Sequence, residues 1–480
     1  MFERAKRMAA LLTAAAMALT LTACSGSGDN AGQGGKSAET TVTADKSGKE
    51  TVRMIIPGLS ENSTVDPVSG LETKSLGEFQ DFLNAKIPDY NIEILTIAWD
   101  GWIQSMEAML TAGEADMGIF TNQEAVPSWY MDLTPYLEKD EEINLNNLSD
   151  LFIDPAVYYT RYKSFNHPEE SGNIYGLPLT IACNMITYDS QLFKEWGVEE
   201  PNEEMTFSQL VDLAEKMTGT NPVTGKKNYG AFIFHEWAEW YALSYDVAKP
   251  FTSDTMNISE LDMDEYVESI KTSPEAKAWF TDFIRLVDCC NEAVATGDGA
   301  DNWLTEDNDT AINFDCNNQT KAYMQYVYAG DSSTTDRYKA VMIPEGTYGA
   351  SFPEFFRLAI AKNAKNPDAA WEVIKDMVTN KEIIDFYLTN YARDKITCLK
   401  DSSGMTMMDY EINQKRLDYQ QKNMFTTDDY WYWRTAMQTI DNQLLSKQYT
   451  ADQAVDAYYN EVKTWVENIK RQSGDSLCRM

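Results

Sequence analysis

The sequence predicts an α/β fold with two lobes, and the chain is expected to cross between them near residue 180. Residues 51–120 alternate between strand-type and helix-type spacing in the order β-α-β-α-β, which is typical of a largely parallel sheet covered by helices. Residues 173–201 predict a bend, a strand and a helix in mid-chain. Further alternation from residue 206 onwards predicts a second α/β region.

Each element of the first region has its own residue pattern. Strand-type runs end at turn residues, and leucine and phenylalanine recur at helical spacing between them. Ligands of parallel sheets bind outside the carboxyl ends of the strands, where loops 58–62, 99–102 and 121–124 carry polar and aromatic residues. The predicted elements are strands at 51–56, 91–97 and 116–120, a helix over 76–87, and a helix that ends at Gly113.

The central stretch predicts the crossing between the lobes. Residues 175–178 are expected to form a bend or a strand edge, because proline lacks a backbone donor and restricts the residue before it. The β-branched and aromatic content of residues 181–188 favours one strand. Ser190 is placed to cap a helix that Gly197 ends.

The second region shows clear start signals for its helices. Ser or Thr three residues before Gln predicts a capping box, and Pro directly after a capping residue predicts a first helical turn. The predicted elements are capping boxes at Thr206/Gln209 and Thr450/Gln453, helices starting at Ser273-Pro274 and Asn366-Pro367, and strands at 229–234, 310–314 and 338–343.

The N-terminus predicts export and a lipid anchor. Three basic residues precede an apolar run at 8–23, which is shorter than the roughly 20 residues of a membrane span and is typical of a secretory signal. Residues 21–24, LTAC, resemble the lipobox of bacterial lipoproteins, in which Cys24 is lipidated, with palmitate among the expected acyl chains. An ordinary signal peptide with an incidental cysteine is the alternative. The polar residues after Cys24, up to residue 49, predict a flexible tether.

The composition excludes some classes of function. A formal net charge of -35 argues against nucleic-acid binding, because an acidic surface repels phosphate. The cysteine spacing gives no zinc pattern and selects no disulfide pairing. The acidic loop 298–309 offers oxygen ligands for Ca²⁺ but lacks the ligand order of an EF-hand, so a solvated turn is the favoured interpretation and no cofactor is expected.

A series of short motifs follows one order along the chain. They are the lipobox, GEADM at 113–117, LTPYL at 133–137, IYGLP at 174–178, ITYD at 186–189, LFKEWGV at 192–198 and KNPDAAW at 365–371. In this order they resemble the lipid-anchored extracellular solute-binding proteins of bacterial ABC importers, in the carbohydrate-binding branch that includes the maltose-binding protein. The chain departs from the family at Asp189, where asparagine is usual, and in its long C-terminal part, which is rich in Trp and Tyr.

The resemblance implies a type II-like periplasmic-binding-protein fold, with two discontinuous α/β lobes joined by a hinge and a ligand cleft between them. It places one lobe at 50–178 plus 339–388 and the other at 179–338 plus 389–480. The implied function is capture of a carbohydrate, in the form of an oligosaccharide, by hinge closure and its delivery to the permease of an ABC importer. The protein is expected to be a monomer outside the cytoplasm, anchored through Cys24.

Candidate ligand residues are aromatic side chains that can stack on sugar faces and planar polar side chains that can bond hydroxyls. Each Trp also has a purely structural interpretation as a core residue. Arg357 is a cation that could pair with an acidic group of a ligand or with Glu354. The candidates are Glu61, Asn62, Trp99, Asp100, Trp102, Asn122, Gln123, Glu124, Thr180, Asn184, His235, Glu236, Trp237, Trp240, Asp315, Asn317, Asn318, Phe352, Arg357, Trp431 and Trp433.

Two other functions stay open at this point. A secreted glycan-degrading lipoprotein would need two positioned carboxylates, which nothing in the sequence singles out. With two histidines and no catalytic motif, we do not expect an enzyme. A sensory binding protein that signals to a membrane kinase is the second alternative.

Overall fold

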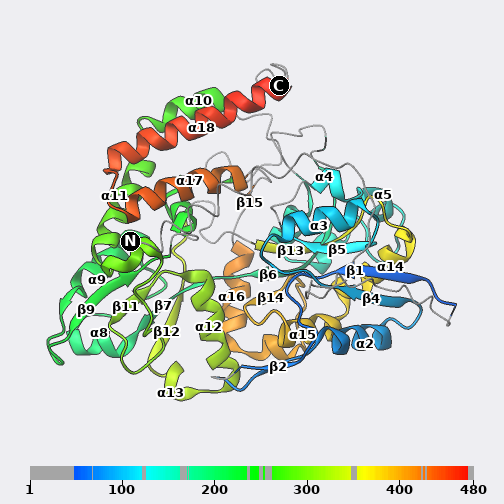
Figure 1. Cartoon of the computed structure of the whole chain (residues 1–480), viewed down its shortest axis with the longest axis horizontal. Helices are drawn as coiled ribbons and strands as arrows, with labels where there is room; N and C mark the ends of the chain where they lie inside the picture. The colour runs from blue at the N-terminus through cyan, green and yellow to red at the C-terminus, as the bar shows by residue number, and fades with distance from the viewer. Residues whose placement is uncertain are drawn as a thin grey trace, which may run out of the picture. The chain divides into compact units, whose positions relative to one another are not determined.

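Two β-sheets flanked by helices organise the chain (Figure 1). The computed structural model describes residues 48–66, 69–121, 126–162, 170, 172–234, 238–247, 252–253, 262–346, 354–422, 425–426 and 430–473. The predicted signal peptide, Cys24 and nearly all of the tether lie outside these residues. No helix in the described part is both long and apolar enough to span a membrane.

The first sheet has six strands in the order β14-β6-β13-β5-β1-β4. Strand β1 pairs in parallel with β4 and β5, whereas β13 runs antiparallel to both β5 and β6. The parallel pairing of β1, β4 and β5 confirms the predicted β-α-β-α-β unit. The strands are β1 (Thr51–Ile55), β4 (Asn91–Leu95), β5 (Met117–Phe120), β6 (Leu177–Ala182), β13 (Glu354–Ile360) and β14 (Lys395–Thr397).

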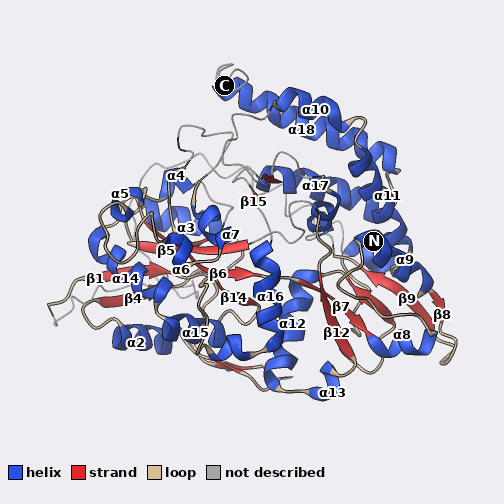
Figure 2. Cartoon of the chain, turned by 180° about the vertical axis from the view of Figure 1, so that it is seen from behind, coloured by secondary structure: helices blue, strands red, loops and turns tan. Residues whose placement is uncertain are grey.

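Helices cover both faces of this sheet because its strands bury side chains on both sides. Val52 and Met54 of β1 lie in one core with the helices α2 (Leu76–Lys86), α14 (Pro367–Thr379) and α15 (Lys381–Asn390). Ile55 lies in a second core with α3 (Trp102–Thr111) and α4 (Val126–Trp129). Figure 2 shows α2 and α15 on one side of the strands and α3 and α4 on the other.

The second sheet has five strands in the order β12-β7-β11-β9-β8. Strands β9 and β11 are parallel, and β7 runs antiparallel to β11 and β12. The strands are β7 (Met185–Asp189), β8 (Gly219–Thr220), β9 (Lys227–Phe232), β11 (Thr310–Asn313) and β12 (Tyr338–Met342). The main helices around it are α8 (Ser190–Trp196), α9 (Phe207–Lys216), α10 (Met263–Ile270), α11 (Pro274–Asp288), α12 (Cys316–Ala329), α17 (Tyr430–Leu445) and α18 (Ala451–Ser473).

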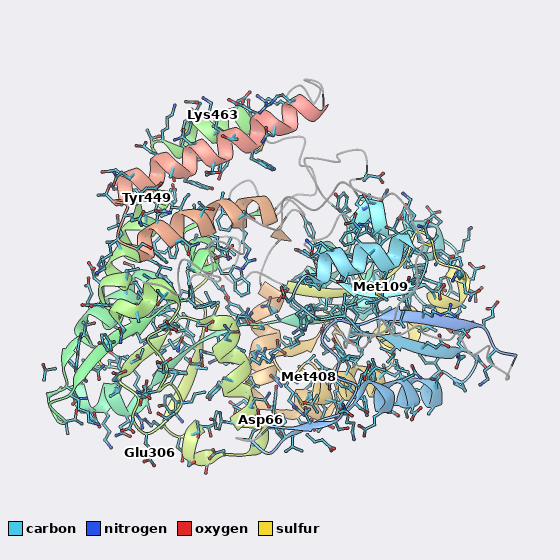
Figure 3. All side chains as sticks on the ribbon, viewed as in Figure 1. Asp66, Met109, Glu306, Met408, Tyr449 and Lys463 are labelled. Atoms are coloured by element: carbon cyan, nitrogen blue, oxygen red, sulfur yellow. The ribbon has the colours of Figure 1, made fainter. Side chains whose placement is uncertain are left out.

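The long C-terminal part belongs to the core of the second sheet. Trp433 and Met437 of α17, and Tyr458 and Val462 of α18, lie in the same core as the strands β7 and β11. Helices α10 and α18 lie side by side in Figures 1 and 2, and Lys463 is on the exposed face of α18 (Figure 3). Both predicted capping boxes are confirmed, because side-chain and backbone groups bond reciprocally at Thr206/Gln209 and at Thr450/Gln453.

The prediction of one strand over residues 181–188 was wrong. Strand β6 ends at Ala182 in the first sheet, and β7 begins at Met185 in the second, so residues 183–184 carry the chain from one sheet to the other. The residues on both sides of the crossing are apolar and strand-forming, so the sequence pattern does not reveal the break.

Pro178 lies within β6, opposite Arg357 of β13, where the register of the pairing shifts. Proline has no backbone donor and is usual at such irregularities.

Sheet membership differs from the predicted lobe limits at three places. The limit after residue 178 falls inside β6, the limit at 338/339 falls inside β12 of the second sheet, and β14 belongs to the first sheet although it follows residue 388. Hydrogen bonding across each sheet, which no local pattern encodes, sets these memberships.

Asp189 is the N-cap of α8, and the prediction of Ser190 for this role was wrong by one residue. The Asp189 carboxylate accepts the amides of Gln191 at 3.0 Å and Leu192 at 3.4 Å. An aspartate cap satisfies free amides of the first turn and also favours the positive end of the helix. The predicted helix end at Gly197 is confirmed by its left-handed conformation, with φ of 64°.

Candidate functional site

The carboxyl ends of β5, β1 and β4 lie side by side at one edge of the first sheet, because these strands are adjacent and parallel. Hydrogen bonds join the loops that follow β1 and β4. The amide of Gly58 donates to the carbonyl of Ile97 at 2.9 Å, and the amide of Leu59 donates to Thr96 Oγ1 at 3.1 Å. The two loops therefore form one surface.

Trp99 is the main exposed aromatic side chain of this surface. Its side chain is 48% exposed, although an indole of this size is normally well buried. Its ring contacts Trp102 edge to face, with 5.7 Å between the ring centroids. A Cβ atom added to Gly58 would lie 2.1 Å from Trp99 Nε1, so the indole rests directly against a glycine backbone. Sequence reasoning missed Gly58 as the residue that gives Trp99 its place.

The other candidates of the first region have mixed positions. Asp100 is exposed next to Trp99 in the loop after β4, and Glu61 and Asn62 are exposed in the loop after β1. Asn122, Gln123 and Glu124 lie outside the described residues.

Arg357 is buried behind the end of β5, with 1% exposure. Its guanidinium donates to the carbonyl oxygens of Thr121 and Tyr159, both at 3.0 Å, and lies over the ring of Phe120 at 4.3 Å. This geometry supports the backbone at the start of the loop that follows β5. Tyr159, which binds Arg357 from α7 (Asp154–Thr160), was not predicted.

Thr180 lies on β6 shortly before the crossing between the sheets and Asn184 lies within the crossing, and both are buried. Thr180 Oγ1 and Asn184 Nδ2 have no hydrogen-bond partner among the described residues. An unpaired buried polar atom is costly, at about 1–3 kcal/mol, so each such atom calls for an explanation, and a further binding partner is one.

Polar residues follow β11 in the second sheet. The Asp315 carboxylate caps α12 by accepting the amide of Asn318 at 3.3 Å, and it also accepts Asn318 Nδ2 at 3.1 Å. Asn317 is half-buried and Asn318 is exposed. Asp315 and Asn318 thus bond each other at the carboxyl end of a strand, and the predicted contacts of these three residues with a ligand stay a prediction.

Two of the predicted stacking residues lie in the core. Trp240 and Trp433 are each 1% exposed, and Trp433 Nε1 donates to the Tyr458 hydroxyl at 2.9 Å. Both residues are therefore core residues, which was the alternative interpretation of each Trp in the sequence. His235, Glu236, Trp237 and Phe352 lie outside the described residues, as does the side chain of Trp431.

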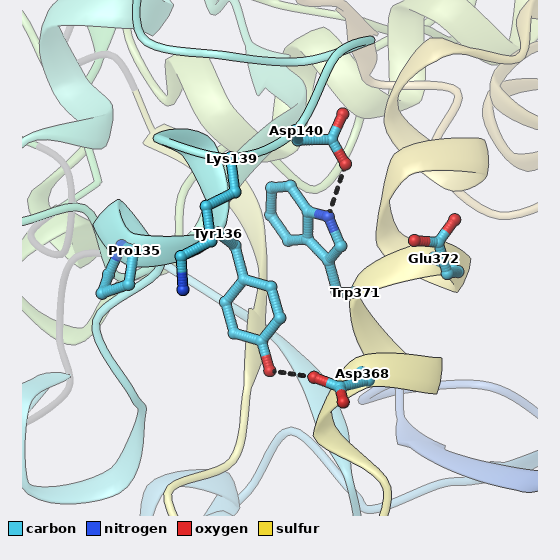
Figure 4. A pocket seen from close by; sticks show the side chains of 7 residues that line it. All are labelled: Pro135, Tyr136, Lys139, Asp140, Asp368, Trp371 and Glu372. Carbon is cyan, nitrogen blue, oxygen red and sulfur yellow. Dashed lines mark hydrogen bonds between the residues drawn. The ribbon is translucent and has the colours of Figure 1, made fainter.

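A surface cavity of about 510 Å³ lies between α5 (Thr134–Leu137) with its following loop and the start of α14 (Figure 4). Tyr136 stacks on Trp371 with 5.2 Å between centroids and donates to Asp368 at 2.8 Å, while Trp371 Nε1 donates to Asp140 at 2.8 Å. Burial opposes ionisation of Asp140, but hydrogen bonds from Lys375, Trp371 and nearby amides outweigh it and lower its pKa to about 2. The polar groups of this cavity thus bond one another.

A second cavity, of about 640 Å³, lies between the loop before α9, the end of β12 and α16 (Glu411–Lys422). Neither cavity is lined by a predicted ligand residue. No group of three or more acidic, histidine or cysteine side chains in the described part is arranged to hold a metal ion.

Comparison with known proteins identifies the fold. The family model described as bacterial extracellular solute-binding protein matches residues 70–383. An ABC substrate-binding protein from Listeria monocytogenes in complex with cycloalternan has a TM-score of 0.62 and 17% identity, covering 89% of this chain and 99% of the other. The search of curated proteins gives no match.

Two further solved structures have the same architecture. The GacH receptor of Streptomyces glaucescens, solved unliganded and with acarbose, has a TM-score of 0.61 and 14% identity, covering 88% of this chain and 99% of the other. The maltose-bound MalE3 of T. maritima has a TM-score of 0.59 and 14% identity, covering 86% and 99%. At these identities the likeness establishes the two-lobed fold.

Proposed function

Since this chain belongs to the family of bacterial extracellular solute-binding proteins, we propose that it captures an oligosaccharide between its two sheets by hinge closure and delivers it to an ABC importer permease. The observation that carries the choice of ligand is the position of Trp99. A half-exposed indole at the carboxyl ends of three adjacent strands offers a flat apolar face where ligands of such sheets bind. Solved relatives of this fold hold cycloalternan, maltose and acarbose.

The proposed ligand contacts are divided between the two sheets. The exposed residues of the first sheet supply a stacking face and hydrogen-bonding groups, and the residues after β11 supply amides and a carboxylate. The unpaired atoms of Thr180 and Asn184 are suited to sugar hydroxyls once the lobes move apart enough to admit them. A ligand that bonds both sides stabilises the closed state by its extra contacts there.

Titration calorimetry against a panel of sugars tests the proposal. The panel contains maltose, maltotetraose, cycloalternan, mannitol and acarbose, with short peptides and spermidine as non-carbohydrate ligands. We expect saturable binding of at least one oligosaccharide and no binding of peptides or spermidine. Binding of a peptide or a polyamine without any carbohydrate would contradict the proposed ligand class and leave the transport role standing.

Replacing Gly58 with alanine is expected to weaken oligosaccharide binding by about tenfold, because the new Cβ would displace the Trp99 indole. Gly58 has φ of +80°, so alanine also costs about 1–2 kcal/mol of stability in this left-handed conformation. Gly225→Ala is the matched control, since Gly225 has φ of +69° and open space around it. Equal loss of affinity in both variants would show that backbone strain, and not Trp99, is responsible.

We further propose that Cys24 anchors the protein to the outer side of the cytoplasmic membrane. The support is the basic start, the apolar run and the LTAC motif, followed by a polar tether. One acyl chain holds a protein only marginally, so stable anchoring requires a multiply acylated cysteine. Mass spectrometry of the N-terminal peptide is expected to give lipid on Cys24, and an unmodified Cys24 that is still joined to residue 23 would contradict this.

A further inference from the structure

The described strands and helices show the chain passing between the two sheets three times. Residues 183–184 make the first crossing, from β6 to β7. The second runs from β12 to β13 and begins at Ile343. The third leaves β14 and contains α16, before α17 joins the core of the second sheet. Helix α16 packs against β14 and lies beside it in Figures 1 and 2.

Side chains of α16 donate to the backbone of both other crossings. Arg416 Nε donates to the carbonyl oxygen of Cys183 at 2.9 Å, and the Tyr419 hydroxyl donates to the carbonyl oxygen of Ile343 at 2.7 Å. The Cys183 thiol donates in turn to the carbonyl oxygen of Arg416 at 3.6 Å. The three crossing segments are thus connected through one helix.

Arg416 has an unusual environment for a cation. It is fully buried, and its other two guanidinium nitrogens donate to Asn413 Oδ1 at 2.9 Å and to the carbonyl oxygen of Asp394. None of these three acceptors is a carboxylate. The carboxylate of Asp394 pairs with Lys395 at 2.7 Å and not with Arg416. Burying a cation without an ion pair is expensive, and an apolar side chain of similar length would fill the same space.

The planar fork of arginine explains why this position carries a charge. Its donors point in fixed directions, so one side chain can hold three backbone or amide oxygens at set angles. The three acceptors come from the first crossing, from the residue that precedes β14, and from α16 itself. Because Cys183 directly precedes Asn184, the guanidinium also fixes the backbone that presents this candidate ligand side chain.

We propose that Arg416 is a positioning residue of the hinge: it holds the first crossing and the end of the first sheet at fixed places against α16, and so limits the relative positions that the two sheets adopt. This inference rests on the proposed function for its effect on ligand binding. Its effect on the ligand-free protein is independent of any ligand. Sequence reasoning missed the residue, although Asn413, Arg416, Leu417 and Gln420 share one buried face at helical spacing.

The test compares Arg416→Met with Arg416→Lys and with Arg285→Met. Arg285 is a partly exposed arginine that pairs with Asp212, Glu215 and Asp282, all within the second lobe, so it controls for loss of a bonded guanidinium elsewhere. Spin labels on cysteines at Glu114 and Val223, which are exposed next to β5 and β9, report the distance between the sheets. The five described native cysteines are buried, and Cys24 and Cys478 are replaced with serine.

In the ligand-free protein, Arg416→Met is expected to broaden the distribution of label distances, Arg416→Lys to restore it in part, and Arg285→Met to leave it unchanged. Oligosaccharide affinity is expected to fall about tenfold in Arg416→Met. A lower melting temperature with an unchanged distance distribution would overturn the proposal and leave Arg416 with a purely structural role. If Arg416→Met does not fold, the lysine variant and Tyr419→Phe decide by the same distance measurement. Absence of any carbohydrate binding would contradict the proposed ligand class and not this inference, because the ligand-free distances still report on the hinge.

Discussion

Asp189→Ala is expected to lower the free energy of unfolding by about 3–5 kcal/mol, because it leaves the charge of Arg337 without its buried partner. Asp189 is fully buried and lies 2.6 Å from Arg337 Nη2 and 3.0 Å from Nε. It also accepts Asn308 Nδ2 at 2.9 Å and caps α8. One carboxylate therefore connects β7, the start of β12 and the loop before β11.

Urea denaturation of the variant beside a matched control measures this effect. Asp212 pairs with Arg285 at 2.5 Å, but its side chain is 50% exposed, so Asp212→Ala is expected to cost less than about 1 kcal/mol. Asp189→Asn keeps the size of the side chain and should fall between the two. Similar losses for Asp189→Ala and Asp212→Ala would contradict the account of Asp189 as the central buried acceptor of the second sheet.

Asp441→Asn is expected to stabilise the protein by about 1–3 kcal/mol at pH 8. Asp441 lies on α17 with 0% exposure, and neither of its carboxylate oxygens has a hydrogen-bond partner among the described residues. Burial, and then the nearby charge of Glu239, raise its pKa well above the ordinary value of 3.8. Glu239 itself pairs with Arg434, also on α17.

The gain from Asp441→Asn should depend on pH in one direction. A carboxyl group whose pKa is higher in the folded state stabilises the folded form only while it holds its proton. The unprotonated Asp441 therefore does not lower the free energy of unfolding of the wild-type protein below about pH 4. Above that pH its destabilising effect grows as the pH rises towards the folded-state pKa. Melting curves at several pH values should give converging stabilities near pH 4. Asp456→Asn, an exposed change on α18, should have no effect, and an equal gain in both variants would contradict this explanation.

Sequence patterns predict an element of this fold well where neighbouring residues alone determine it. The parallel β1, β4 and β5, the capping boxes and the end of α8 at Gly197 all follow from residue type and spacing. The crossing at residues 183–184 does not, since the residues on both sides have the same apolar, strand-forming character. Pairing of β6 with β13 and β14, and of β7 with β11 and β12, separates the two strands.

The sequence predicts which loops follow the strands at the candidate site, but not which of their side chains are exposed. Position after a parallel strand predicted the places of Trp99, Trp102 and Asp315, which follow β4 and β11, and their contact with a ligand stays a prediction. Trp240 and Trp433 could not be excluded in this way, because an indole next to polar residues has the same sequence context whether it is buried or exposed. Gly58 and Arg416 were missed, since each acts through a tertiary contact between distant segments.

Small-angle X-ray scattering with and without the carbohydrate found by calorimetry tests hinge closure most directly. If the ligand binds between the two sheets and selects the closed state, saturation should reduce the radius of gyration, and a non-binding sugar of equal size should leave it unchanged. Saturable carbohydrate binding with no change in the scattering curve would contradict capture by closure.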